Sequence, residues 1–336
     1  MDVLRDVLGI DVSKAKLDVA LLVNGKVRAK VVPNNPEGHQ TLLEWLKKSK
    51  ADLSALHVCM EATGVYHEAV ATTLHATGFK VSVVNPACIK GFGHSENIRN
   101  KNDEIDAGLI ARYCLAMAPD PWTPPPIEQR QLRAWTLRVA ALKDIRQQEA
   151  NRLEAHQVAD MKDVAEHVME HIVWLDTEIK KLEEEIDDHI DRHPGLKQDA
   201  ELIASIPGIG STTVARVLGH LGDIRRFATA KAFAAFLGVT PKQRTSGSSV
   251  RGRTMVSKTG NSSLRAALFM PSMVARRHNP ILRQFAERLL NTGMAKRAVI
   301  GAVMHKLTHL IYGVIKTGKP FDANYLSNRL AIQDGI

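Results

Sequence analysis

The sequence is poor in aromatic residues and in cysteine, and both shortages exclude classes of protein. Aromatic residues make up 5% of the 336 residues, which argues against the base-stacking platforms of single-strand-binding proteins. The three cysteines, Cys59, Cys88 and Cys114, form no CxxC pair and lie in apolar stretches. We therefore expect reduced, buried thiols in a cytoplasm, not a disulfide framework or a zinc site.

Membrane and export signals are also missing. No apolar run approaches the roughly 20 residues that cross a bilayer. The N-terminus, MDVLRDVLGIDVSK, lacks the charged, apolar and small-residue sections of a signal peptide. The chain shows no internal repeat, and its length is sufficient for two or three domains with separate cores.

Charge is distributed unevenly along the chain. Residues 1–125 have no net charge, with 14 Lys+Arg and 14 Asp+Glu. Residues 126–196 hold 10 Lys+Arg and 16 Asp+Glu, a net charge of −6. Residues 197–336 hold 21 and 6, a net of +15. A basic third beside a neutral and an acidic third is typical of nucleic-acid-binding proteins, although a merely soluble basic surface is the alternative.

The first third alternates predicted strands and helices. Three antiparallel strands are expected at 7–12, 16–23 and 26–33, and Asn24-Gly25 is a hairpin signal between the last two. A helix, the strand LHVCMEA, a second helix and the strand FKVSVVNP follow. This order predicts an α/β sheet that carries helices, over residues 1–125.

The rest of the chain is predicted to be mainly helical. The stretch PDPWTPPPIEQ, residues 119–129, holds five prolines and is expected to be a linker. Apolar residues then recur at the a and d spacing of a coiled coil: Val168, Ile172, Leu175, Ile179, Leu182 and Ile186. This spacing leaves open whether the helix pairs within one chain or between two. A block rich in Gly, Ser, Thr and Arg, residues 238–260, interrupts the helices of the last third.

Four acidic residues fall at the ends of predicted elements. Asp11 ends the first strand and Glu61 ends the fourth, while Asp103 and Asp106 begin a helix after the fifth. Strand ends and adjoining helix starts line one edge of an α/β sheet, so these carboxylates are expected to converge. Mg²⁺, or Mn²⁺ in its place, would relieve their repulsion, and two such ions would stabilise the reacting oxygens of phosphodiester cleavage. Taken singly, each acid has an ordinary explanation as a turn or helix-capping residue.

A second metal-phosphate interpretation exists for Asp11. GID followed by a hairpin also resembles the first phosphate loop of actin-like sugar kinases. That loop usually has Gly or Thr directly after the Asp, whereas Val12-Ser13 follows here, and no later Gly-Gly nucleotide loop is present. The kinase interpretation is therefore the weaker one.

The basic third holds two candidate nucleic-acid contacts. Gly208 and Gly210 in SIPGIG lie between two helical runs, similar to a helix-hairpin-helix motif whose amides face a phosphate. A plain interhelical turn is the alternative. The second candidate is a set of cations in and after the Gly/Ser block: Lys242, Arg244, Arg251, Arg253, Lys258 and Arg265.

Three serines lie among these cations and offer a nucleophile. Their spacing does not say which of Ser246, Ser248 and Ser249 would act, and a loop that only binds the nucleic-acid backbone is the alternative. No His–Asp pair is clearly placed to serve them. The histidines of the later helices are expected to be surface or core residues: His278, His305 and His309.

Taken in order, these motifs resemble one family over nearly the whole chain. They are GIDVSK with Asp11, EATGVY with Glu61, NKNDEIDA with Asp103 and Asp106, SIPGIG, and SGSSVRG with Ser246. The family is the DEDD-type insertion-sequence transposases, understood as bridge-RNA-guided serine recombinases and related to Piv-type DNA invertases. The resemblance implies that the four acids bind metal and that Ser246 is the nucleophile.

The resemblance also implies an architecture. It comprises a RuvC-like (RNase H-like) α/β domain over 1–125, a coiled-coil segment over 126–195, and a mainly α C-terminal transposase domain with the helix-hairpin-helix over 196–336. The protein would assemble as a dimer to tetramer in a bacterial cytoplasm, with acids of one subunit meeting the serine of another.

The implied reaction has DNA and RNA partners. Ser246 would attack a DNA phosphate and form a phosphoserine intermediate, and strands would then be exchanged and religated. Donor and target DNA duplexes would pair with a structured guide RNA. Two other functions stay open: a RuvC-like nuclease that hydrolyses branched DNA without Ser246, and a non-catalytic RNA- and DNA-binding scaffold.

Overall fold

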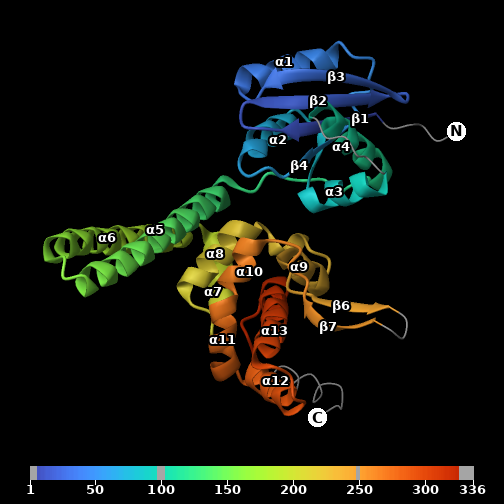
Figure 1. Ribbon diagram of the computed structural model, residues 1–336. Coiled ribbons are helices and arrows are strands. Elements are labelled where there is room, and N and C mark those ends of the chain that lie inside the picture. The colour runs from blue at the N-terminus through green and yellow to red at the C-terminus, as the bar shows by residue number, and fades with distance from the viewer. Residues whose placement is uncertain (1–5, 97–102, 247–249, 325–336) are drawn as a thin grey trace. The chain divides into compact units, whose positions relative to one another are not determined.

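The computed structural model describes residues 6–96, 103–246 and 250–324, and the chain divides into two compact units, Met1–Pro124 and Pro125–Ile336 (Figure 1). The side chains of residues 103–104, 243–246 and 250–254 lie outside this description. The division falls inside the predicted linker. The start of that linker belongs to the first unit, because the Trp122 backbone N–H donates to the Val81 carbonyl at 2.7 Å.

A five-stranded mixed sheet forms the centre of the first unit. Its strands are β1 (Val7–Val12), β2 (Lys16–Val23), β3 (Lys26–Pro33), β4 (His57–Glu61) and β5 (Lys80–Val84). The order is β3-β2-β1-β4-β5; β1, β2 and β3 pair antiparallel, and β4 and β5 run parallel to β1. Asn24 and Gly25 have φ of 48° and 75°, as the tight turn between β2 and β3 requires. The predicted α/β sheet is confirmed.

Helices cover both faces of this sheet (Figure 1). α1 (Pro36–Lys47) and α2 (Tyr66–Ala76) pack on one face, and α3 (Pro86–Ser95) and α4 (Asp103–Met117) pack on the other. α3 was not among the predicted helices, although Asn85 caps it and Pro86 begins it. Cys88 on α3 is exposed, so the expectation of three buried thiols was wrong for it and right for Cys59 and Cys114.

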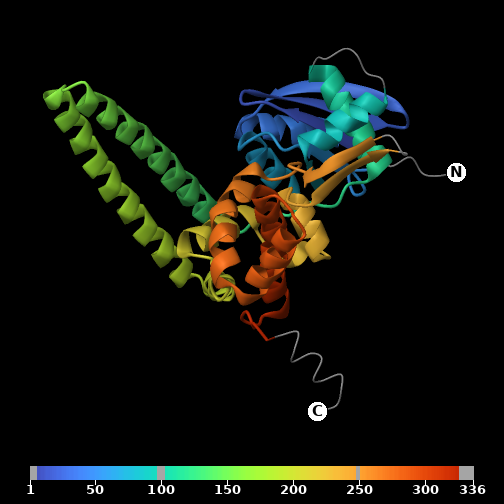
Figure 2. The same cartoon turned by 60° about the horizontal axis from the view of Figure 1, so that its bottom comes forward.

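The second unit begins with a helical hairpin. α5 (Ile127–Val158) and α6 (Lys162–Arg192) are joined at one end (Figures 1 and 2). Five of the six predicted a and d residues of α6 are buried, and Leu182 is half-buried. Salt bridges link the two helices, with Lys143 Nζ 2.6 Å from Glu183 Oε1. The heptads therefore pair within one chain.

The remaining helices pack around one long core. They are α7 (Pro194–Ala204), α8 (Ser211–Leu221), α9 (Ala230–Leu237), α10 (Ser262–Ala267), α11 (Phe269–His278), α12 (Pro280–Asn291) and α13 (Lys296–Thr317), with a 3-10 turn at Ile224–Arg226. This core runs from Leu132 on α5 to Ile315 on α13. The mainly helical C-terminal part is confirmed, and the division at residue 195 stays a prediction, because helices on both sides of it share this core.

The expectation that no apolar run approaches the length of a membrane span was wrong for α13. By length and composition alone it could cross a membrane. Its apolar side chains Val299, Val303, Leu307 and Ile311 are fully buried against the other helices of the unit. Packing in the core therefore accounts for the apolar character of this helix.

A β-hairpin occupies the block that composition described only as small, polar and basic. β6 (Pro241–Ser246) and β7 (Val250–Val256) pair antiparallel, from Pro241 opposite Val256 to Ser246 opposite Val250. Thr245 precedes SGSS, and Val250, Thr254 and Val256 follow it; β-branched residues on both sides of a Gly/Ser turn are a hairpin signal. The glycines and serines dominate the composition of this block and obscure those residues.

His220 on α8 makes the stability of the second unit depend on pH. Burial, together with the nearby charges of Arg133 and Arg216, lowers the pKa of His220 from its ordinary 6.5 to about 4. Between these values the unfolded chain binds a proton that the folded chain does not, so the folded state loses stability as pH falls from about 6.5 to about 4.

Replacing this side chain should remove that component. We expect the free energy of unfolding to fall less between pH 7.5 and pH 4.5 in His220→Gln than in the wild type, as measured by urea titration at each pH. His278→Gln, at an exposed position, is the control. An equal fall in all three proteins would show that other groups carry the pH dependence.

Candidate metal and nucleic-acid sites

α4 packs directly on β1. A Cβ at Gly9 would lie 2.2 Å from the Ala107 carbonyl oxygen and 2.4 Å from the Ala111 nitrogen. Only glycine at position 9 permits such a close approach of the helix backbone to the strand. Farther along α4, the Cys114 thiol donates to the His57 carbonyl at 3.7 Å, so the C-terminal half of α4 lies over the start of β4.

These contacts orient the acids. Because Ala107 lies over Gly9 and Cys114 lies near the start of β4, α4 runs opposite to β1 and β4. The N-terminal turn of α4, which carries Asp106, therefore lies toward the strand ends that carry Asp11 and Glu61.

Asp11 and Glu61 belong to the face of the sheet that α4 covers. Side chains two residues apart on a strand share a face, so Asp11 lies on the side of Gly9 and Glu61 on the side of Cys59, which is in the core beneath α4. Ile10 and Met60 are partners in the parallel β1–β4 register. Asp11 and Glu61 are the next residues on these two strands, so they are neighbours. Both side chains are half-buried, as is Asp106.

The chemistry of this edge fits a divalent cation. Its donors are carboxylate oxygens, which are the ligands that Mg²⁺ and Mn²⁺ prefer. Asp103 is the first residue of α4, and its side chain lies outside the description. Within the described side chains, no three His, Cys, Asp or Glu residues are close enough to hold a metal ion. Convergence of the four acids on a metal therefore stays a prediction.

Asp18 is an acid at this site that the sequence analysis missed. It lies directly opposite Asp11 in the β1–β2 register and is only 6% exposed. It shares a face of β2 with Ala20, which packs beneath α4. Lys16 Nζ lies 3.1 Å and 3.3 Å from its two carboxylate oxygens. An acid inside the otherwise apolar run LDVALL was the available signal.

The predicted nucleophile lies in the second unit. Ser246 is the last residue of β6, and its backbone is paired with Val250. Ser248 and Ser249 lie outside the described residues. The structure therefore places the backbone of Ser246 at the end of a hairpin arm, and it does not select among the three serines.

Five of the six predicted cations lie on or just after the β6–β7 hairpin, and the sixth lies on α10. Lys242, Arg244, Arg251 and Arg253 lie on the two strands of the hairpin, and Lys242 is exposed. Lys258 is exposed just after β7. Arg265 has a structural partner instead, because its Nη1 donates to the Leu237 carbonyl at the end of α9, at 3.3 Å. Phosphate contacts by these six residues stay predictions.

The three histidines of the later helices are surface or partly buried residues. His278 ends α11 and is exposed. His305 and His309 lie one turn apart on α13 with ring centroids 4.5 Å apart, and burial lowers the pKa of both. Neighbouring cations lower these pKa values further: Lys306 acts on both rings and Lys231 on His309.

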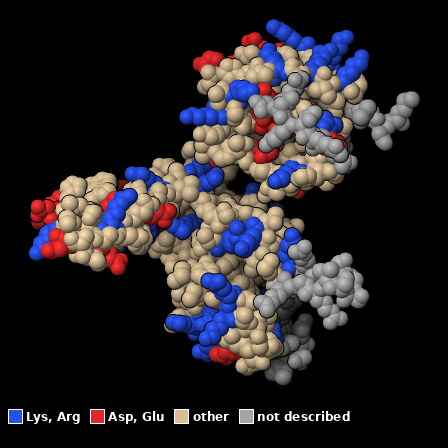
Figure 3. All heavy atoms as spheres, viewed as in Figure 1, with Lys and Arg blue, Asp and Glu red and all other residues tan. Residues whose placement is uncertain are grey.

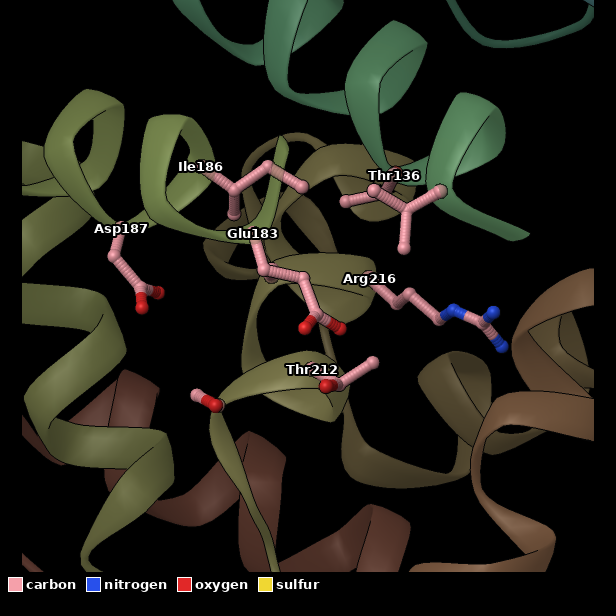
Figure 4. A pocket seen from close by; sticks show the side chains of 9 residues that line it. Thr136, Glu183, Ile186, Asp187, Thr212 and Arg216 are labelled. Atoms are coloured by element: carbon pink, nitrogen blue, oxygen red, sulfur yellow. The ribbon is translucent and has the colours of Figure 1, made fainter. Parts of the chain in front are cut away.

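Packing within the second unit explains the glycines in the turn between α7 and α8. Gly208 has φ of +102°, and a Cβ there would lie 2.5 Å from the Ala275 Cα of α11. Gly210 caps α8 and faces open space. A small cavity of about 130 Å³ lies beside the start of α8, and Figure 4 shows Glu183 directed toward Thr212 there. These features account for the turn without a bound phosphate, and the helix-hairpin-helix contact stays a prediction.

The same cavity carries negative charge. Asp187 lies one turn after Glu183 on α6, and Arg216 of α8 lines the opposite side (Figure 4). Burial and the carboxylates of Asp191, Glu183 and Asp188 raise the pKa of Asp187.

Figure 3 shows acidic side chains on the α5–α6 hairpin and groups of lysine and arginine on the helices that follow it.

Comparison with known proteins adds independent evidence. Residues 8–158 match a DEDD-type transposase model, and residues 200–287 match the model "Transposase IS116/IS110/IS902 family". The chain is 33% identical over 316 residues to the pilin gene-inverting protein of Moraxella bovis, covering 94% of this chain and 97% of the relative. It is 23% identical over 300 residues to the transposase for insertion element IS1111A of Coxiella burnetii, covering 81% and 78%.

The fold, the acidic sheet edge and these similarities define a DNA-rearranging enzyme. The chain belongs to the IS110 family of DEDD transposases and DNA invertases. Membership implies DNA as substrate and the use of a divalent metal.

Proposed function

We propose that this protein is an RNA-guided recombinase of an insertion sequence, with a RuvC-like N-terminal domain and a serine nucleophile. The observation that carries the proposal is the arrangement of the first unit: β1, β4 and the first turn of α4 bring Asp11, Glu61 and Asp106 to one edge of one sheet. Family membership supports the use of this edge in DNA rearrangement.

The acids would serve the metal-dependent part of the reaction. Mg²⁺ held by Asp11, Glu61, Asp103 and Asp106 would supply Lewis-acid polarisation of a DNA phosphate. Asp106 and Asp103 come from the start of a helix, whereas Asp11 and Glu61 come from strands, so the set depends on α4 staying seated on Gly9. In this proposal the sheet would position two of the ligands, and the position of α4 would set the other two.

Ser246 would supply the covalent step. Its Oγ forms a bond to a backbone phosphorus while the bond from that phosphorus to one DNA oxygen breaks, and the serine proton ends on the leaving oxygen. The phosphoserine link conserves the phosphodiester energy, so a hydroxyl of another strand can attack it and regenerate Ser246 without ATP.

The basic residues would bind the nucleic acids. Lys242, Arg244, Arg251, Arg253 and Lys258 surround Ser246 in sequence and lie on or just after the hairpin strands, where they would hold the phosphate backbone. Gly208 and Gly210 would approach a second backbone segment, while Arg265 would add a contact from α10. Sequence would be read by a guide RNA that pairs with donor and target DNA, and a dimer to tetramer would bring the acids of one subunit to the serine of another.

A covalent-adduct assay tests this function. Full-length protein with its co-purifying RNA, Mg²⁺ and labelled element-junction DNA is run on a denaturing gel. We expect a protease-sensitive, shifted DNA band with the wild type, Ser248→Ala and Ser249→Ala, and none with Ser246→Ala. Digestion of the RNA before the DNA is added should also remove the band.

Other outcomes separate the alternatives. Cleavage without an adduct, equal in wild type and Ser246→Ala, would identify a RuvC-like hydrolytic nuclease. Binding without any Mg²⁺-dependent cleavage would identify a scaffold. An adduct that survives RNA digestion would remove RNA guidance and leave the serine mechanism in place.

A further inference from the structure

Beside Asp11 the sheet holds an ion pair that the proposed mechanism does not use. Asp18 lies opposite Asp11 in the antiparallel β1–β2 register, where Cβ atoms are about 5 Å apart. Its side chain is 9% exposed, and both of its carboxylate oxygens lie within 3.3 Å of Lys16 Nζ. The first unit therefore places a fifth carboxylate, in contact with an ammonium group, next to a proposed metal ligand.

Burial makes this arrangement costly unless it is compensated. An ionised carboxylate that is nearly excluded from water needs a partner charge or hydrogen bonds. Lys16 supplies that charge from the same face of β2, two residues away, and its side chain stays 43% exposed. Its long stem lets the ammonium reach a buried carboxylate while part of the side chain remains in water.

The pair also controls the charge next to Asp11. A free Asp18 carboxylate at this position would add a negative charge and two hard oxygen donors within reach of a cation bound to Asp11. Bound to Lys16, Asp18 contributes almost no net charge, and its oxygens are occupied by the ammonium. The ion pair thus limits both the charge and the number of oxygens offered to a metal.

We propose that Lys16 and Asp18 form a positioning pair for the metal site, in which Lys16 holds Asp18 out of the metal's coordination shell and sets the metal affinity of the acids around Asp11. The proposal rests on the metal site proposed above. It assigns to Lys16 and Asp18 opposite effects on affinity, which a purely structural ion pair would not have.

Metal binding by single and double variants tests the pair. Free Mn²⁺ is measured by electron paramagnetic resonance during titration into the full-length protein. Lys16→Met removes the ammonium bound to Asp18 and should tighten Mn²⁺ binding by about tenfold, whereas Asp18→Asn removes a negative charge beside Asp11 and should weaken it by about tenfold. The double variant restores the charge balance and should bind within about threefold of the wild type.

Controls keep the outcomes distinct. Asp52→Asn changes an exposed acid near the opposite end of the sheet, where its N–H contacts Asp6, and should bind like the wild type. Thermal melting without metal shows which variants fold, and Lys16→Gln replaces Lys16→Met if the latter does not. Asp11→Asn should lose Mn²⁺ binding.

Two results would overturn the proposal in different ways. If Asp11→Asn loses Mn²⁺ while Lys16→Met and Asp18→Asn both weaken binding or leave it unchanged, the metal site stands and the positioning pair is wrong. If Asp11→Asn binds Mn²⁺ like the wild type, the metal lies elsewhere, and both the proposed site and the pair are wrong.

Discussion

Asp106→Asn is expected to slow DNA strand cleavage by about 10³-fold while DNA binding is retained. Asp106 lies on the first turns of α4, above the strand end that carries Asp11. In the proposed site Asp106 is a charged ligand of a divalent cation, which an amide does not replace, and a 10³-fold slower cleavage corresponds to about 4 kcal/mol of lost stabilisation. The change is isosteric, so the seating of α4 on β1 should be preserved.

The measurement is single-turnover cleavage of labelled junction DNA, with DNA affinity measured separately. Asp120→Asn is the matched control, because Asp120 is an exposed acid of the same unit whose carbonyl accepts the Ser82 hydroxyl hydrogen bond. The control should cleave at the wild-type rate. Wild-type cleavage by Asp106→Asn would remove this residue from the proposed metal site and leave Asp11, Glu61 and Asp103 as its candidates.

Gly9→Ala is expected to have a large structural effect at the contact between α4 and β1. The new Cβ would lie 2.2 Å from the Ala107 carbonyl and 2.4 Å from the Ala111 nitrogen, and both are backbone atoms of α4. The helix must move away from β1, so we expect the free energy of unfolding to fall by about 3 kcal/mol. Cleavage should be lost as well, because α4 carries Asp103 and Asp106.

Gly91→Ala provides the matched comparison. Gly91 lies inside α3 of the same unit, and nothing lies within 4 Å of a Cβ added there. Alanine in this open helical position should leave stability unchanged or raise it slightly. Urea unfolding and single-turnover cleavage are measured for both variants. Equal stability and equal cleavage rates in the two variants would show that α4 can shift without disturbing the acids.

Much of the first unit was readable from local patterns. The three predicted strands 7–12, 16–23 and 26–33 match β1, β2 and β3, and the Asn24-Gly25 turn has the expected positive φ. Alternation and turn chemistry act over a few residues, so neighbouring sequence is sufficient to specify them. Asp103 at the start of α4 was predictable for the same reason.

The second unit was less readable. The heptad residues of α6 were identified, but their spacing is the same for a partner in the same chain or in another, and only the packing of α5 against α6 decides between them. The β6–β7 hairpin was missed because its Gly, Ser and Arg content resembles that of a loop, and cross-strand pairing is a contact between separate segments.

By itself, the sequence determined the family and indicated a chemistry: acids at element ends, a basic final third, serines among cations, and the order of motifs that marks the family. The tertiary structure decided what lies beside those acids. Position 9 requires glycine only because α4 packs directly on it. Asp18 neighbours Asp11 only because β1 and β2 pair in this register. Both facts are contacts between segments, set by the packing of a helix and the register of a sheet, which local sequence patterns do not contain.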